Sequence, residues 1–262
     1  MKQTIALAAI ALGMMPAEAK DRPSVAPKNM QAITSGLAGY TDNVLFGDVW
    51  LRPELTPRDR SLVTLSALVA TGKSAQLAGH LNRGLVNGLK PTEIAGMVTQ
   101  PAFYTGWPNA VSALNIVEQV FSDRKIDPAT WRLTASQSSK LPNQEPRQAD
   151  EPGIARVSPK FAELSDQVLY KDLWQRPDLA PRDRSLVTIA ATAANGDVNE
   201  LAYQVQRGLA NGLKRAEIAE AFIHLAFYAG WPKATAALRL ADGIFHQEEL
   251  ASPETDKRED VH

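Results

Sequence analysis

The sequence predicts an all-α protein that contains two tandem copies of one helical unit. Residues 57–64 return unchanged as residues 181–188, and the offset of 124 holds without a gap from Pro53/Pro177 to Phe121/Phe245, with 35 identities in 69 aligned positions. Apolar residues recur at helical spacing in both copies, and no stretch alternates apolar and polar residues for long enough to indicate a strand. We therefore expect repeat one at residues 30–121 and repeat two at residues 161–245.

The duplicated run opens the first helix of each repeat. Thr56 offers a capping hydroxyl, Pro57 suits the first helical turn, and Asp59 lies at the positive end of the helix dipole. Gly72 fits a left-handed C-cap, so this helix is expected to end there. Its apolar face indicates that it lies mostly in the core.

Three further helices are expected in each repeat. The second spans residues 75–87, copied as 198–211, and both copies end in Asn-Gly. The third spans residues 91–104 and its copy 215–228. The repeated Gly-Trp-Pro sequence then breaks the chain, and a fourth helix continues to Phe121 or Phe245.

The segments outside the repeats have different compositions. Residues 1–19 read as a signal peptide, with Lys2, an apolar run and a small-x-small cleavage site after Ala19, so we expect an exported protein, periplasmic or secreted. The alternative, a membrane anchor, is disfavoured because the apolar run is shorter than the roughly 20 residues that span a bilayer. We expect a loose lead-in at 21–28, a helix at 30–46 with its counterpart at 161–170, a linker at 122–160 and a charged tail at 246–262. Within the linker, residues 126–133 could pack back on the fold.

Charge and cysteine content exclude several functions. The net charge is −1, from 28 basic and 29 acidic residues, which gives no basic footprint for nucleic acid. Outside the signal segment no apolar run is long enough for a membrane span, so no membrane partner is expected. Cysteine is absent, which excludes thiol redox chemistry and thiolate metal sites.

A polar pair on the second helix differs between the repeats. Gln76 and His80 are four residues apart and share a helical face, and their counterparts are Glu200 and Gln204. A glutamate and a histidine one turn apart would form a proton-transfer pair, and each repeat holds half of it. The alternative is that all four are partly exposed polar positions on an amphipathic helix. No metal site is expected, because His80 has no second ligand at metal-binding spacing in its own repeat.

Two other groups of residues allow both a structural and a functional interpretation. His224 precedes Tyr228 by one turn, and its equivalent is Gln100. The Phe-Tyr-x-Gly-Trp-Pro motif is either a helix break held by buried aromatic rings or the wall of an apolar pocket. The arginines of the duplicated run either grip a substrate carboxylate or lock helices or subunits together.

Several motifs in order resemble the carboxymuconolactone decarboxylase family, which has the alkylhydroperoxidase D-like fold. They are the PRDRSLVT run, the Gln76–His80 segment with Leu81-Asn82-Arg83, Asn87-Gly88-Leu89, Glu93-Ile94, the FYxGWP motif and the matching segments of repeat two. The peroxidase branch of this family needs Cys-x-x-Cys, so a thiol peroxidase is excluded. The decarboxylase branch implies a cofactor-free reaction, decarboxylation or isomerisation, on a small carboxylated lactone or organic acid.

The resemblance also implies roles for particular residues. His80 is expected to carry the proton, with Glu200 and His224 as further catalytic candidates, and Arg60 or Arg184 to recognise the anion. The other substrate-binding candidates line the pocket: Gln76, Tyr104, Trp107, Gln204, Tyr228 and Trp231. Single-repeat members of the family form rings, so a tandem chain is expected to form a homotrimer that mimics a hexamer. The alternative function is a non-catalytic exported module that binds small molecules or serves as an oligomeric scaffold.

Overall fold

A computed structural model describes residues 23–132 and 152–251 of the 262-residue chain, and every regular element in these two ranges is helical. The predicted signal peptide, residues 1–19, lies outside the described residues. The chain divides into two compact units, residues 1–51 and 52–262, and each is described by itself. None of the helices in the described ranges is long and apolar enough to cross a bilayer.

The first unit contains short helical segments rather than the single helix expected at 30–46. Helix α1 (Lys28–Ile33) ends at Thr34, whose extended φ of −142° interrupts the helix before α2 (Ser35–Gly39). A π-helical turn, η2 (Tyr40–Leu45), and a 3₁₀ turn, η3 (Val49–Leu51), follow. The lead-in is also not loose throughout, because the Asp42 carboxylate accepts hydrogen bonds from Ser24 Oγ at 2.6 Å and from the main-chain N–H groups of Val25 and Ala26.

The four helices expected in repeat one are confirmed. They are α3 (Pro57–Ala70), α4 (Ser74–Val86), α5 (Pro91–Thr105) and α6 (Trp107–Asp123). The Thr56 hydroxyl accepts a hydrogen bond from the Asp59 N–H at 3.1 Å and so caps α3. Gly106, with φ of +95°, separates α5 from α6 and adopts a backbone conformation that other residues rarely tolerate.

Repeat two follows the same order. Its elements are α8 (Pro159–Leu164), η5 (Ser165–Tyr170), η6 (Leu173–Gln175), α9 (Pro181–Asn195), α10 (Val198–Ala210), α11 (Arg215–Ala229) and α12 (Trp231–Ala251). Helix α12 runs past Phe245, so the expected tail starts too early. An ion pair between Arg215 and Glu249 ties this extra turn to the start of α11.

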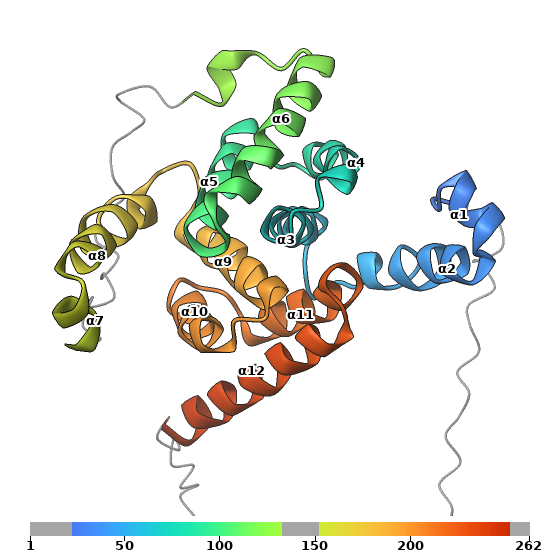
Figure 1. Ribbon diagram of the computed structural model, residues 1–262. Helices are drawn as coiled ribbons and strands as arrows, with labels where there is room; N and C mark the ends of the chain where they lie inside the picture. Colours follow the sequence, from blue (N-terminus) through green and yellow to red (C-terminus); the bar gives the residue numbers. More distant parts are fainter. Residues whose placement is uncertain (1–22, 133–151, 252–262) are drawn as a thin grey trace, which may run out of the picture. The chain divides into compact units, whose positions relative to one another are not determined.

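The two repeats share one core. Helices α3 and α9 pack against each other, and each also packs against the third helix of the opposite repeat, α3 against α11 and α9 against α5 (Figure 1). Twelve of the fourteen residues of α3 are buried, which confirms it as a core helix. The helix starts are joined by reciprocal ion pairs, Arg58 to Asp183 at 2.7 Å and Arg182 to Asp59 at 2.9 Å. The third helix of each repeat is therefore placed against the first helix of the other.

The described parts of the predicted linker are partly ordered. Ile126 and Trp131 pack back on the core, with the Trp131 ring 4.9 Å from that of Phe121, and a 3₁₀ turn, η4 (Pro128–Thr130), lies between them. Helix α7 (Pro152–Val157) also forms within the range expected to be linker, and residues 133–151 lie outside the described ranges.

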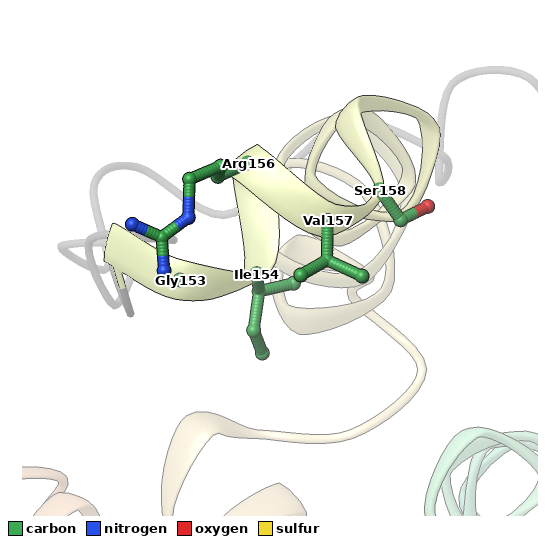
Figure 2. A pocket seen from close by; sticks show the side chains of 5 residues that line it. All are labelled: Gly153, Ile154, Arg156, Val157 and Ser158. Carbon is green, nitrogen blue, oxygen red and sulfur yellow. The ribbon is translucent and has the colours of Figure 1, made fainter.

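Two hollows lie along this part of the chain. One of about 900 Å³ lies between α5, α6 and residues 122–132. Figure 2 shows the other, about 300 Å³ beside α7, where Arg156 extends to one side and Ile154 to another. No residue that the sequence analysis singled out as a site residue lines either hollow.

Candidate functional site

Residues from both repeats meet in a cluster around His80. Its members lie on α3, α4 and α11, and we call it the His80 cluster: His80, Tyr228, His224, Thr64, Arg60 and Glu220. The Tyr228 ring lies edge-on to His80, with ring centroids 5.3 Å apart, and 5.0 Å from the centroid of His224. His80 comes from repeat one and the other two rings from repeat two. A single repeat therefore does not contain this cluster.

The helix packing of the core explains this arrangement. Helix α11 lies against α3, which brings the inner side chains of α11 beside Thr64 and Arg60. His224 and Tyr228 are one helical turn apart on α11, so both face the same neighbours. His224 is completely buried, whereas His80 and Tyr228 are partly exposed. His80 and Tyr228 are therefore the members of the cluster that solvent reaches.

The hydrogen bonds of Thr64 indicate the tautomer of His224. The Thr64 hydroxyl donates to the Arg60 carbonyl at 2.9 Å, as is common within helices. With that proton on the Arg60 carbonyl, we assign the 2.8 Å contact between the Thr64 hydroxyl and His224 Nε2 as a hydrogen bond that the imidazole donates. In the neutral ring Nδ1 is then the unprotonated nitrogen.

Both imidazoles favour the neutral form. Burial lowers the pKa of His80 to about 4, and the charge of Arg83 acts in the same direction. Burial also lowers the pKa of His224 well below its ordinary value, and the charge of Arg60, joined by that of His80 when His80 is protonated, reinforces the shift. The cluster thus combines two neutral imidazoles, a phenol and the ion pair of Arg60 with Glu220.

Arg60 and Glu220 form a buried ion pair within the cluster. Arg60 is fully buried, and its Nη2 donates to Glu220 Oε1 at 2.9 Å and to the carbonyl of Arg52 at 2.8 Å. Glu220 also accepts from Arg52 Nε at 2.8 Å. Sequence reasoning did not identify Glu220. The available signal was that repeat one has Gly96 at the equivalent position.

The pseudo-symmetric position holds a second cluster of different composition. We call it the Tyr104 cluster, and its members are Tyr104, Gln100, Thr188, Arg184, Asp178, Glu200, Gln204 and Trp174. Trp174 Nε1 donates to the Tyr104 hydroxyl at 2.8 Å, and Gln204 Nε2 donates to Glu200 Oε1 at 2.6 Å. Burial raises the pKa of Tyr104, and the charge of Glu200 contributes to the rise.

Arg184 is held much as Arg60 is, although by different residues. Its Nη2 donates to Asp178 Oδ1 at 2.7 Å and to the carbonyl of Arg176 at 2.6 Å. Burial lowers the pKa of Arg184, and the Asp178 charge opposes that shift. The counter-ion thus comes from the same repeat, whereas the counter-ion of Arg60 comes from the opposite one.

Three predicted site residues lie outside both clusters. Gln76 is exposed one turn before His80. Trp107 and Trp231 are 57 % and 61 % exposed in the chain and lie edge-on to Phe103 and Phe227 with ring centroids 5.0 Å apart. The expectation that buried rings hold the helix break is therefore wrong for the tryptophans, because each stands at the first position of a helix that turns it outward. In the described ranges no group of three or more His, Cys, Asp or Glu side chains is placed to hold a metal ion.

Comparison with known proteins agrees with the duplicated architecture. The model of the carboxymuconolactone decarboxylase family matches residues 36–119 and again residues 159–243. The chain belongs to this family.

Two relatives are decarboxylases by name. A 4-carboxymuconolactone decarboxylase from Acinetobacter baylyi is 31 % identical over 101 residues, which are 38 % of this chain and 75 % of the relative. The nitrosuccinic acid decarboxylase npaB from Metarhizium robertsii is 31 % identical over 78 residues, which are 30 % of this chain and 54 % of the relative. Each alignment is shorter than half of the chain.

Proposed function

We propose that the protein is a cofactor-free carboxy-lyase that acts on a small carboxylated lactone or organic acid at the His80 cluster. The observation that carries the proposal is the placement of His80 and Tyr228 edge to face at the partly exposed side of a cluster that ends at the buried cation Arg60. Family membership and the two related decarboxylases support the reaction type.

Decarboxylation needs a group that stabilises the negative charge left on the substrate carbon, and a source of a proton for that carbon. The bond between the carboxylate and the substrate carbon breaks, its electron pair stays on that carbon, carbon dioxide leaves, and a proton is added to the carbon. A conjugated lactone carbonyl or a nitro group stabilises the electron pair. The protein must therefore hold an anion in a desolvated site and deliver a proton.

His80 is the proton carrier in this scheme. Its imidazole is neutral near pH 7 because burial lowers its pKa. A bound carboxylate brings negative charge beside the ring, which raises the imidazole pKa, so His80 takes up a proton when the substrate binds. It then delivers that proton to the carbon that loses carbon dioxide. In an isomerisation the same ring would remove a proton from one carbon and return it to another.

Arg60 and Arg184 are the two candidates for holding the substrate carboxylate. Both guanidinium groups are fully buried and occupy equivalent positions on α3 and α9. Arginine suits this task because its planar donors match the two oxygens of a carboxylate.

The direct test measures carbon dioxide release by the full chain from 4-carboxymuconolactone and from nitrosuccinic acid. We expect turnover of at least one small carboxylated compound of these two kinds, and a loss of about 100-fold or more in His80→Gln, as removal of a general acid or base produces. His246→Gln is the matched control, since His246 is exposed on α12. Unchanged turnover in His80→Gln would contradict the proposal, and tight binding without turnover would favour a small-molecule-binding module.

We also propose that the protein is exported after cleavage behind Ala19, on the basis of the sequence of residues 1–19. N-terminal sequencing of the protein from its native host tests this. A mature protein that retains Met1 in the cytoplasmic fraction would contradict it.

A further inference from the structure

Arg60 and Arg184 differ in one hydrogen bond. Arg184 Nη1 donates to Gln100 Oε1 at 2.8 Å. Arg60 Nη1 is equally buried, yet no group among the described residues accepts a hydrogen bond from it. The Nε atoms of both arginines lack an acceptor within the same residues, so Nη1 makes the difference. A buried N–H without an acceptor is costly, and a carboxylate oxygen is the acceptor that a guanidinium prefers.

The cause is the residue beside each arginine. Gln100 has two functions, because its Nε2 donates to Thr188 Oγ1 at 3.0 Å while its Oε1 accepts from Arg184. His224 occupies the equivalent position in the His80 cluster, where its Nε2 forms a hydrogen bond with Thr64 Oγ1 at 2.8 Å. His224 thus forms the hydrogen bond to threonine that Gln100 forms in the other cluster. It does not accept a hydrogen bond from Arg60, so Arg60 Nη1 remains able to donate.

The residues at the His80 position of the two clusters differ as well, since His80 is partly exposed whereas Gln204 is fully buried. The position of His80 is taken by Gln204 in the Tyr104 cluster, and Gln204 Nε2 donates to the Glu200 carboxylate at 2.6 Å. The charge of Glu200 reaches the Tyr104 hydroxyl. Each arginine already has one carboxylate counter-ion, Glu220 for Arg60 and Asp178 for Arg184. An incoming carboxylate meets the further charge of Glu200 in the Tyr104 cluster, but meets a neutral imidazole and a phenol in the His80 cluster.

We infer that each chain binds one substrate carboxylate, at Arg60. His224 leaves Arg60 Nη1 able to donate a hydrogen bond to that carboxylate, whereas Gln100 already accepts the hydrogen bond of Arg184 Nη1. The inference rests on the proposed function only in calling the bound carboxylate a substrate. It leaves Arg60 as the one candidate of the two arginines for binding that carboxylate. The Tyr104 cluster is a structural copy that takes no anion. His224 is a positioning residue for carboxylate recognition, because it acts through Arg60.

Succinate is a suitable non-reacting probe, since it is a small dicarboxylate without a group that would stabilise the carbanion. Isothermal titration calorimetry of the full chain should give one succinate per chain. His224→Gln should weaken succinate binding at least 10-fold, because a glutamine can accept from Arg60 as Gln100 does from Arg184. The same variant should unfold at the wild-type temperature or above, since it repeats a hydrogen-bond pattern already present in the fold.

Gln100→His is the matched reverse substitution, and it should leave the succinate affinity of the Arg60 site and the rate of turnover unchanged. Two equivalent succinate sites in the wild type, no succinate binding at all, or unchanged affinity in His224→Gln would each overturn the inference. If His224→Gln fails to fold, the wild-type stoichiometry still decides. Because these readouts are binding measurements, one succinate per chain without any carbon dioxide release would refute the proposed function while leaving the single anion site intact.

Discussion

Arg60 of repeat one and Glu220 of repeat two form a buried ion pair, with 2.9 Å between Nη2 and Oε1. The equivalent of Glu220 in repeat one is Gly96, where a Cβ atom would come within 3.0 Å of the Asp178 carboxyl carbon. Asp178 serves as counter-ion to Arg184 instead. Each buried arginine therefore has one carboxylate, supplied from a different position of the repeat.

Removal of Glu220 should be strongly destabilising. Glu220→Ala leaves Arg60 buried without its counter-ion, which typically costs about 3–5 kcal/mol of unfolding free energy. Glu54→Ala is the matched control, because Glu54 is the partly exposed equivalent of Asp178 and lies 3.5 Å from Arg52, so its loss should cost less than about 1 kcal/mol. Urea unfolding compares the two variants. Equal unfolding midpoints would show that losing the buried ion pair costs no more stability than losing the exposed one.

Acid should destabilise the fold in part through His80. The pKa of His80 falls from 6.5 to about 4 on folding, so between these values the unfolded chain binds a proton that the folded chain does not. Stability is therefore complete above about pH 6.5 and declines as the pH falls towards 4. The decline is at most about 3 kcal/mol from this residue, and solvent access to the ring reduces it.

The test compares unfolding midpoints between pH 7 and pH 4. The groups that face His80 include Arg83 on its own helix, and His224 and Tyr228 on α11. We expect a shallower decline in His80→Gln than in the wild type, with His246→Gln unchanged. A decline of the same steepness in both variants would assign the acid sensitivity to other groups.

The two first helices offer a matched pair of capping variants. Thr56 caps α3 through its hydroxyl, whereas Ala180 at the equivalent position gives α9 no side-chain cap. Thr56→Ala should cost about 1 kcal/mol of stability, and Ala180→Thr should add up to a similar amount. Thermal unfolding measures both. A loss in both variants would mean that position 180 is constrained by packing rather than by its missing cap.

The homotrimer remains a prediction. On α6 of the single chain, Trp107, Val111 and Leu114 lie on one face and are 57 %, 52 % and 50 % exposed. Light scattering should give about three times the 28.4 kDa of the full chain, or slightly less after loss of the signal peptide. Val111→Glu should lower that mass if this face is buried between subunits. A monomeric wild type would contradict the prediction.

The sequence predicted the framework of the fold from local rules. Thr56, Pro57 and Gly72 mark the ends of α3 because capping and left-handed glycine are properties of a few consecutive residues. The break at Thr34 was not predictable in this way, since the apolar spacing continues across it. The extension of α12 was missed because a charged segment resembles a frayed tail until its ion pair with α11 is known.

The candidate site was only partly predictable. His80 and His224 were identified as positions where the copies differ, but not as neighbours, since contacts between residues far apart in sequence depend on how α11 packs against α3. The interpretation that each repeat holds half of a Glu-His pair was based on one helix at a time. The structure instead places His80 with rings from the other repeat and Glu200 with Gln204.

The joining of both copies in one polypeptide has a consequence for symmetry. In a dimer of identical single-repeat chains, the two sites related by the twofold axis would carry the same residues. Equivalent positions could then not differ as Glu220 differs from Gly96, or His224 from Gln100. Because one gene encodes both repeats as separate segments of the chain, a substitution at a position in one repeat leaves the equivalent position in the other repeat unchanged. The chain is in effect a permanently paired heterodimer, in which the His80 cluster and the Tyr104 cluster carry different residues at equivalent positions.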